Sequence, residues 1–129
     1  MVSINDHLAY ADPPIRPTLL ELQKRITALD PRKISENPTE QRRITYSVAR
    51  IFAEVKVQKT KILVGFFDMG VSDPMKLVRH IPYAKNQNWQ HDKEIRIDSL
   101  KAVDYAMRFV EASYRSHLTN SPPRLFGRG

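Results

Sequence analysis

The chain has 129 residues, a net charge of +7 and no cysteine. This length suits one domain, and the lack of cysteine excludes a disulfide framework, a zinc–thiolate site and a thiol nucleophile. No stretch approaches the roughly 20 apolar residues of a membrane span, and the first residues lack the pattern of a signal peptide. We therefore expect a cytoplasmic protein with one folded domain over residues 1–118 and a flexible tail over 119–129.

Two helices are predicted at the start of the chain. Ser3 can cap a short helix over residues 4–9, and the prolines that follow Asp12 would end it. A second helix is predicted over residues 17–29, because its leucines and isoleucine recur on one broad face. Residues 35–39 are predicted to form a loop.

Three strands are predicted next, over residues 42–48, 51–57 and 61–69. Apolar and polar residues alternate in the middle strand, which predicts that Phe52 and Lys56 point away from the core. The third strand is apolar on both faces. That pattern is typical of a central strand, or of a strand whose outer face is also covered.

The remaining elements are predicted to be a short helix, one or two strands and a long helix. Asp73 and Pro74 favour a helix start, with Met75, Leu77 and Val78 on its buried side. Residues 81–92 are polar and irregular and hold one short strand at most. A strand over residues 94–98 then leads to Ser99, which can cap a helix over residues 100–118.

This order of elements predicts a two-layer α+β domain, in which the helices pack on one face of an antiparallel sheet. The other face is left for solvent, for a partner chain or for a ligand. We see no internal repeat and no linker between two large domains.

The stretches "SINDHL", "ITYSVARIFAEVKVQKTKILVGFF", "NWQHDKEIRI" and "DSLKAVDYAMRFVEASY" give the chain a family resemblance. Over residues 3–118 it resembles a bacterial domain of unknown function, found alone or at the C-terminus of GmrSD-type restriction nucleases. It is also similar to the YdhG-like and MmcQ/YjbR-like families. The most specific motifs are Phe52-Ala53-Glu54 and Asp104-Tyr105. The resemblance implies a secretion-chaperone-like fold with the order α-β3-α-β2-α, and it implies no established activity.

The positive charge is concentrated in the predicted strands. Residues 42–69 hold six cations against two anions, which leaves an excess of +4 in less than a quarter of the chain. The six cations are Arg42, Arg43, Arg50, Lys56, Lys59 and Lys61. Such a patch can attract phosphates or acidic proteins. Ordinary solvation and the protection of strand edges explain it at least as well.

The motifs of several enzyme classes are missing from the sequence. None of the four glycines has the spacing of a phosphate-binding loop, no serine lies in a nucleophile elbow, and the histidines are scattered. We therefore predict no catalytic residue, no metal site and no cofactor. Glu54 and Lys56 share a strand face as in Mg²⁺-dependent restriction-type nucleases, but Asp30, the nearest upstream aspartate, follows a helix.

Trp89 and His91 lie in the polar segment before the last strand. Together they could line a small-ligand pocket, although capping of the core edge is the simpler interpretation of the tryptophan.

The main functional hypothesis is a non-enzymatic binding module. Its six clustered cations would contact nucleic acid or a nucleoprotein, as an accessory of a nucleic-acid-processing or defence system. The alternative is a protein-interaction or homodimerisation domain that uses the open sheet face, which Phe52 and Phe67 would favour. Salt separates the two hypotheses, since phosphate contacts weaken steeply with salt and a hydrophobic dimer does not.

Overall fold

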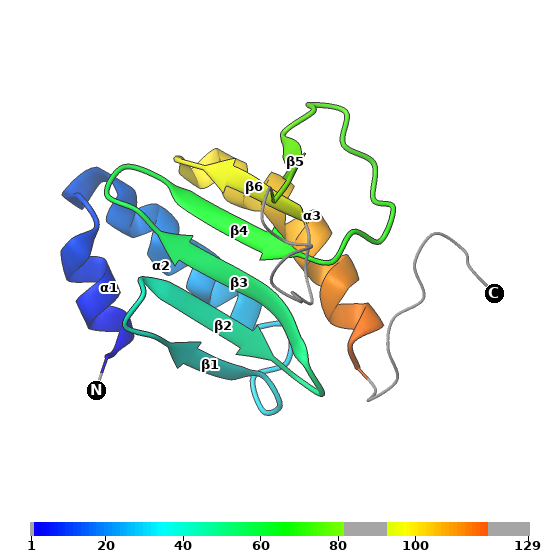
Figure 1. Cartoon of the computed structure of the whole chain (residues 1–129), viewed down its shortest axis with the longest axis horizontal. Helices are drawn as coiled ribbons and strands as arrows, with labels where there is room; N and C mark the ends of the chain where they lie inside the picture. The colour runs from blue at the N-terminus through cyan, green and yellow to red at the C-terminus, as the bar shows by residue number, and fades with distance from the viewer. Residues whose placement is uncertain (1, 82–92, 119–129) are drawn as a thin grey trace.

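The computed structural model describes residues 2–81 and 93–118. Two short helical segments open the chain, and they are followed by a longer helix, six strands and a final helix (Figure 1). The helical segments are α1 (Ile4–Tyr10), the 3₁₀ turn η1 (Pro13–Ile15), α2 (Arg16–Thr27) and α3 (Leu100–Ser116). The strands are β1 (Ser35–Pro38), β2 (Arg43–Ser47), β3 (Ile51–Val57), β4 (Ile62–Phe66), β5 (Val78–His80) and β6 (Lys93–Ile97).

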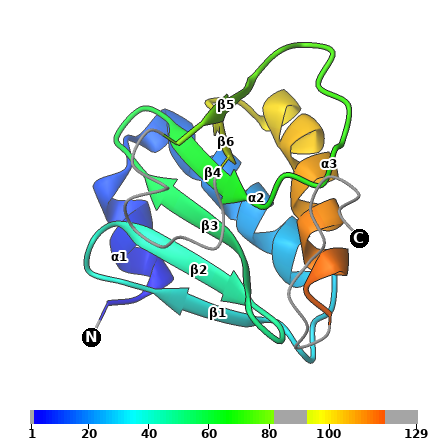
Figure 2. The same ribbon diagram turned by 45° about the vertical axis from the view of Figure 1, so that its right-hand side comes forward.

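The strands form one antiparallel sheet in the order β1-β2-β3-β4-β6-β5. The helices α2 and α3 lie side by side along one face of this sheet, and α3 packs against β3, β4 and β6 (Figure 2). α1 lies beside the end of the sheet at which β2 begins (Figure 1). The predicted α+β architecture is therefore confirmed.

The core lies between the sheet and the two long helices. Strand register aligns Ile44, Val55, Val64 and Ile95 across four neighbouring strands, and all four side chains are buried. Each removes apolar surface from water, which is the main favourable term in folding. Every residue of β4 is buried, in agreement with its prediction as a central strand.

Two stretches differ from their predictions in secondary structure. Ser35–Pro38 is the edge strand β1 and not a loop, because its backbone pairs in register with β2. No helix follows Asp73, and the chain turns there instead. The predicted burial is wrong for Met75 and Leu77, which are 62% and 38% exposed, whereas Val78 is partly buried and packs against the core.

Asp73 makes this turn by accepting hydrogen bonds within it. Its carboxylate accepts from the backbone N–H groups of Leu77 and Val78, each at 3.0 Å, and from the hydroxyl of Tyr105 on α3. An aspartate that caps a helix would bond donors two or three residues ahead. Here the donors lie four and five residues ahead, so the same side chain closes a wider loop that leads into β5.

The prediction that Phe52 points outward is wrong. Tyr46 opposes Ala53 and Ser47 opposes Ile51, so Phe52 is an extra residue in β3, a β-bulge. The bulge turns the ring of Phe52 into the core, where it is 0% exposed and meets Tyr114 of α3 edge-on at 5.3 Å. The carbonyl of Phe52 accepts a hydrogen bond from Ser113 at 2.7 Å, which ties the bulge to α3.

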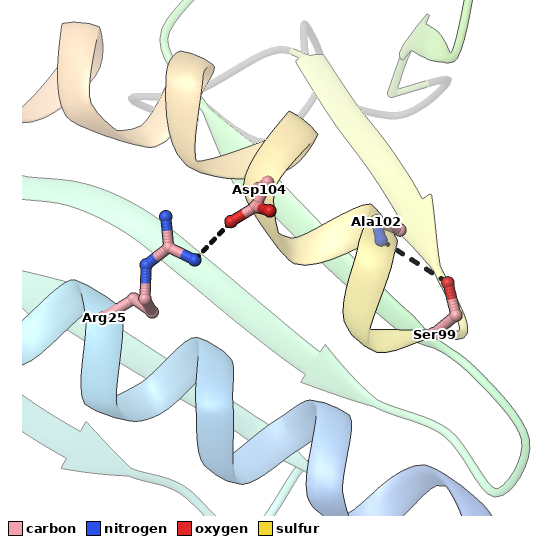
Figure 3. A network of polar contacts seen from close by, with 4 residues as sticks. All are labelled: Arg25, Ser99, Ala102 and Asp104. Carbon is pink, nitrogen blue, oxygen red and sulfur yellow. Dashed lines mark hydrogen bonds and ion pairs between the residues drawn. The ribbon is translucent and has the colours of Figure 1, made fainter.

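Polar contacts at the surface fix the start of α3 and its position beside α2 (Figure 3). The Ser99 side chain accepts a hydrogen bond from the backbone N–H of Ala102 and so caps α3 as predicted. Asp104 on α3 pairs with Arg25 on α2 at 2.5 Å. Because both side chains of this pair are well exposed, it contributes at most about 1 kcal/mol.

Trp89, His91 and the predicted tail over residues 119–129 lie outside the described residues. Within the described ranges, no helix combines the length and the apolar character that crossing a membrane requires.

Candidate functional site

Five of the six predicted contact residues lie at one end of the sheet, where β2 begins, β3 ends and β4 begins. We call this group the cationic end, and it consists of Arg42, Arg43, Lys56, Lys59 and Lys61. Backbone hydrogen bonds hold the segments together, from Val57 to the carbonyl of Arg42 at 2.8 Å and from Gln58 to that of Lys61 at 3.0 Å. The group lies beside α1, at the left of Figure 1.

Arg50 lies at the opposite end of β2 and β3, in the turn that joins them. Two of its guanidinium nitrogens are buried without a hydrogen-bond partner in the described part of the chain. The structure therefore does not bring Arg50 together with the other five cations.

Tyr10, at the end of α1, supports two of the cations. The guanidinium carbon of Arg42 lies 3.9 Å from the centre of the Tyr10 ring, and the Lys59 ammonium lies 4.8 Å from it. Both distances suit a cation–π interaction, which holds the charges against the α1 surface. Arg42 adopts a left-handed backbone conformation, with φ of 62°, which is uncommon for a residue with a side chain. Tyr10 could not be predicted as part of this group, because α1 is far from the strands in sequence.

Carboxylates neutralise little of this charge. Arg43 pairs with Glu54 on the neighbouring strand, at 3.8 Å. In the ranges 2–81 and 93–118, no carboxylate lies within ion-pair distance of Arg42, Lys56, Lys59 or Lys61. Four cations therefore keep their full charge for a partner.

A row of side chains runs from the cationic end across the uncovered sheet face. Strand register aligns Arg43, Lys56, Leu63 and Arg96 on β2, β3, β4 and β6. The exposure of this face is uneven, because Leu63 is only 8% exposed and Glu94, in the next row, only 7%. The cations of the uncovered face therefore lie around Leu63 and Glu94.

The nuclease pattern of Glu54 and Lys56 is not completed by Asp30. Glu54 lies on the uncovered face beside Arg43, whereas Asp30 lies on the helix side and accepts a hydrogen bond from Tyr114 at 3.4 Å. No three histidine, aspartate or glutamate side chains gather as a metal site in the residues that the structure describes.

His7 on α1 is fully buried close to the cationic end. Burial lowers the pKa of His7 below its ordinary value, and the positive charge of Arg42 lowers the pKa further. The nearby carboxylate of Asp6 opposes both effects without reversing them. His7 is therefore neutral near pH 7 and adds no charge to the site.

The family model of a domain of unknown function, DUF5655, matches residues 4–117, which is nearly the whole chain. The chain therefore belongs to this family. No curated protein and no solved structure matches it.

Proposed function

We propose that this member of the DUF5655 family is a non-enzymatic module that binds nucleic-acid phosphates through its cationic end. The observation that carries the proposal is the convergence of five cations, four of which have no ion-pair partner among the described residues. Such cations can displace counterions from a phosphate backbone, which is the main source of affinity in non-specific binding.

The arrangement favours phosphate contacts over the reading of bases. Arg43 and Lys56 are direct neighbours on adjacent strands, about 5 Å apart, and Lys59 and Lys61 extend the charge beyond them. The ring of Tyr10 is occupied by Arg42 and Lys59, so it supports cations and does not serve as a platform for a base. We therefore expect weak sequence preference and strong salt dependence.

We place this module in the bacterial cytoplasm, as an accessory of a nucleic-acid-processing or defence system. The support is the resemblance of the chain to domains at the C-terminus of GmrSD-type restriction nucleases and to YdhG-like proteins. In such a role it would add affinity for nucleic acid or a nucleoprotein to a catalytic partner.

Binding to short single- and double-stranded DNA and RNA, measured by fluorescence anisotropy across a salt series, tests the proposal. Four phosphate contacts to a single strand would give a slope of log K against log salt of about −3. Raising the salt from about 50 to 200 mM would then weaken binding roughly 50-fold. Absence of binding at the lowest salt would refute the proposal.

Charge reversal locates the contact. The variant Lys56→Glu, Lys59→Glu, Lys61→Glu should lose binding. The matched control is Lys24→Glu, Lys33→Glu, Lys101→Glu, which makes the same change in net charge at exposed lysines outside the cationic end. Equal losses in the two variants would show that total charge, and not this end of the sheet, is responsible.

The alternative, homodimerisation through the uncovered sheet face, has less support. Phe52 belongs to the core, and Phe67 is only partly exposed and packs on His117 with ring centres 5.0 Å apart. Light scattering over a range of protein concentrations tests this alternative, and a monomer throughout would remove it.

A further inference from the structure

A second group of cations lines a pocket at the edge of the sheet that β6 and β5 form. The pocket has a volume of about 450 Å³ and lies between the loop before β5, the end of β6 and the first turn of α3. Three cations line it, and they come from separate segments: Lys76 from the loop, Arg79 from β5 and Arg96 from β6.

The charge of this pocket is only partly balanced. Arg79 is held by Glu94, with its Nη2 at 2.5 Å and its Nε at 2.7 Å from the same carboxylate oxygen. Neither Lys76 nor Arg96 forms an ion pair within the described residues, and Asp98 is the one carboxylate in the lining. Arg79 and Glu94 balance each other, so Lys76 and Arg96 against Asp98 leave an excess of one positive charge.

The wall that carries Lys76 is held in place by hydrogen bonds. Asp73 accepts from the backbone N–H groups of Leu77 and Val78, and the hydroxyl of Tyr105 donates to Asp73 from α3. Lys76 itself has φ of 55°, in the left-handed region. The loop therefore presents Lys76 in a defined position, and ordering it would cost little when a ligand binds.

The pocket also has apolar surface. Leu77, Val78 and Ala102 also line it, and Leu77 is 38% exposed. Volumes of this order are typical of pockets that take small organic ligands. A ligand that suits the lining would have a compact anionic group joined to an apolar or aromatic part.

We propose that this pocket binds a phosphorylated small molecule, with its phosphate between Lys76 and Arg96. A phosphate monoester carries close to two negative charges near pH 7, and Lys76 and Arg96 are two cations with no ion-pair partner among the described residues. Guanidinium groups bind phosphate by charge-assisted hydrogen bonds. The apolar part of the ligand would lie against Val78 and Ala102. This proposal does not depend on the binding of nucleic acid at the cationic end.

Calorimetry and amide chemical-shift titrations with phenyl phosphate, inorganic phosphate and benzoate test this proposal. We expect phenyl phosphate to bind with a dissociation constant in the millimolar range or below, and more tightly than either other probe. The largest shifts should fall on the amides of Leu77, Val78 and Ala102. If none of the three probes gives saturable shifts there, the proposal is wrong, and tighter binding of benzoate would refute the preference for phosphate.

A pair of double variants identifies the residues responsible. Lys76→Gln, Arg96→Gln should weaken the binding of phenyl phosphate at least about tenfold, the effect of losing roughly 1.4 kcal/mol of interaction. The control Lys24→Gln, Lys33→Gln removes two exposed cations elsewhere and should leave binding unchanged. Unchanged binding in the first variant would overturn the assignment.

A third variant separates this proposal from that of nucleic-acid binding. Lys59→Gln, Lys61→Gln should weaken oligonucleotide binding and leave the dissociation constant of phenyl phosphate as it is. If this variant lost the binding of both the oligonucleotide and phenyl phosphate, the two sites would not be independent.

Discussion

Tyr10 and His7 show how single side chains of α1 support the cationic end. Tyr10 holds Arg42 and Lys59 through its ring face, and His7 fills the space close to them as a neutral group. Neither contact can be predicted from the pattern of the strands. The spacing of apolar residues indicates which side chains face the core, but it does not indicate that the end of α1 lies beside the turn between β3 and β4. The six cations were predicted as one group because they fall within residues 42–69, and Arg50 departs from the other five because it lies at the opposite end of β2 and β3.

His7 makes stability depend on pH. Its pKa is lower in the folded protein than the ordinary value of 6.5, so the unfolded chain binds more protons between these two values. The stabilisation is therefore complete above about pH 6.5 and decreases as the pH falls toward the folded pKa. We expect the midpoint of urea unfolding to fall between pH 7.5 and 5.5 in the wild type.

The variant His7→Leu should reduce that dependence, because it removes the group that must stay neutral. The control His80→Leu replaces an exposed histidine and should keep the wild-type slope. A slope that is the same in His7→Leu as in the wild type would assign the pH dependence to other groups.

Phe52 gives a test of the β-bulge. Because its ring is in the core, Phe52→Ala should lower the free energy of unfolding by about 3–5 kcal/mol. Lys56→Ala, on the uncovered face of the same strand, should change it by at most about 0.5 kcal/mol. Equal, small effects in chemical denaturation would mean that the ring is outside the core, as simple alternation had predicted.

At the scale of elements, the helix caps could be predicted from the local sequence, whereas contacts between distant segments could not. The caps at Ser3 and Ser99 were predicted and are present. Asp73-Pro74 also has the pattern of a helix start, but the carboxylate bonds Leu77, Val78 and Tyr105, and the last of these contacts spans 32 positions in sequence. A contact at that separation cannot be inferred from the local sequence, and neither can the pairing that makes a strand of Ser35–Pro38.

The loop at Asp73 should open when its acceptor is removed. In Asp73→Ala the amides of Leu77 and Val78 lose their hydrogen bonds, so their hydrogen exchange should speed up roughly tenfold or more. Tyr105→Phe keeps both amide bonds and should have a smaller effect. Protection that is unchanged in Asp73→Ala would show that the carboxylate does not hold the loop.

Acid should open the same loop. Burial would raise the pKa of Asp73, but the hydrogen bonds from Tyr105 and from the backbone N–H groups of the turn outweigh it and lower the pKa below 3.8. The contribution of Asp73 to stability is therefore complete above about pH 4 and disappears as the pH falls through the lowered value.

At the scale of the whole molecule, the sequence was sufficient for the architecture because most elements carry a clear period and a clear end. The sequence did not show whether a motif such as Phe52-Ala53-Glu54 or Asp104-Tyr105 serves the function or the fold of the protein. Phe52 packs on Tyr114, Asp104 pairs with Arg25, and Tyr105 holds Asp73, so the motifs that carry the family resemblance make contacts that join the helices to the rest of the fold.

One face of the sheet is therefore covered by the helices, and five of the six predicted contact residues lie together at one end of the sheet. The most direct test of this arrangement is to titrate the ¹⁵N-labelled protein with a short single-stranded oligonucleotide at low salt and to map the amide shifts. We predict that the largest shifts fall on residues 42–43 and 56–61 and vanish as salt is added. Shifts centred on α2 and α3, or none at any salt concentration, would contradict it.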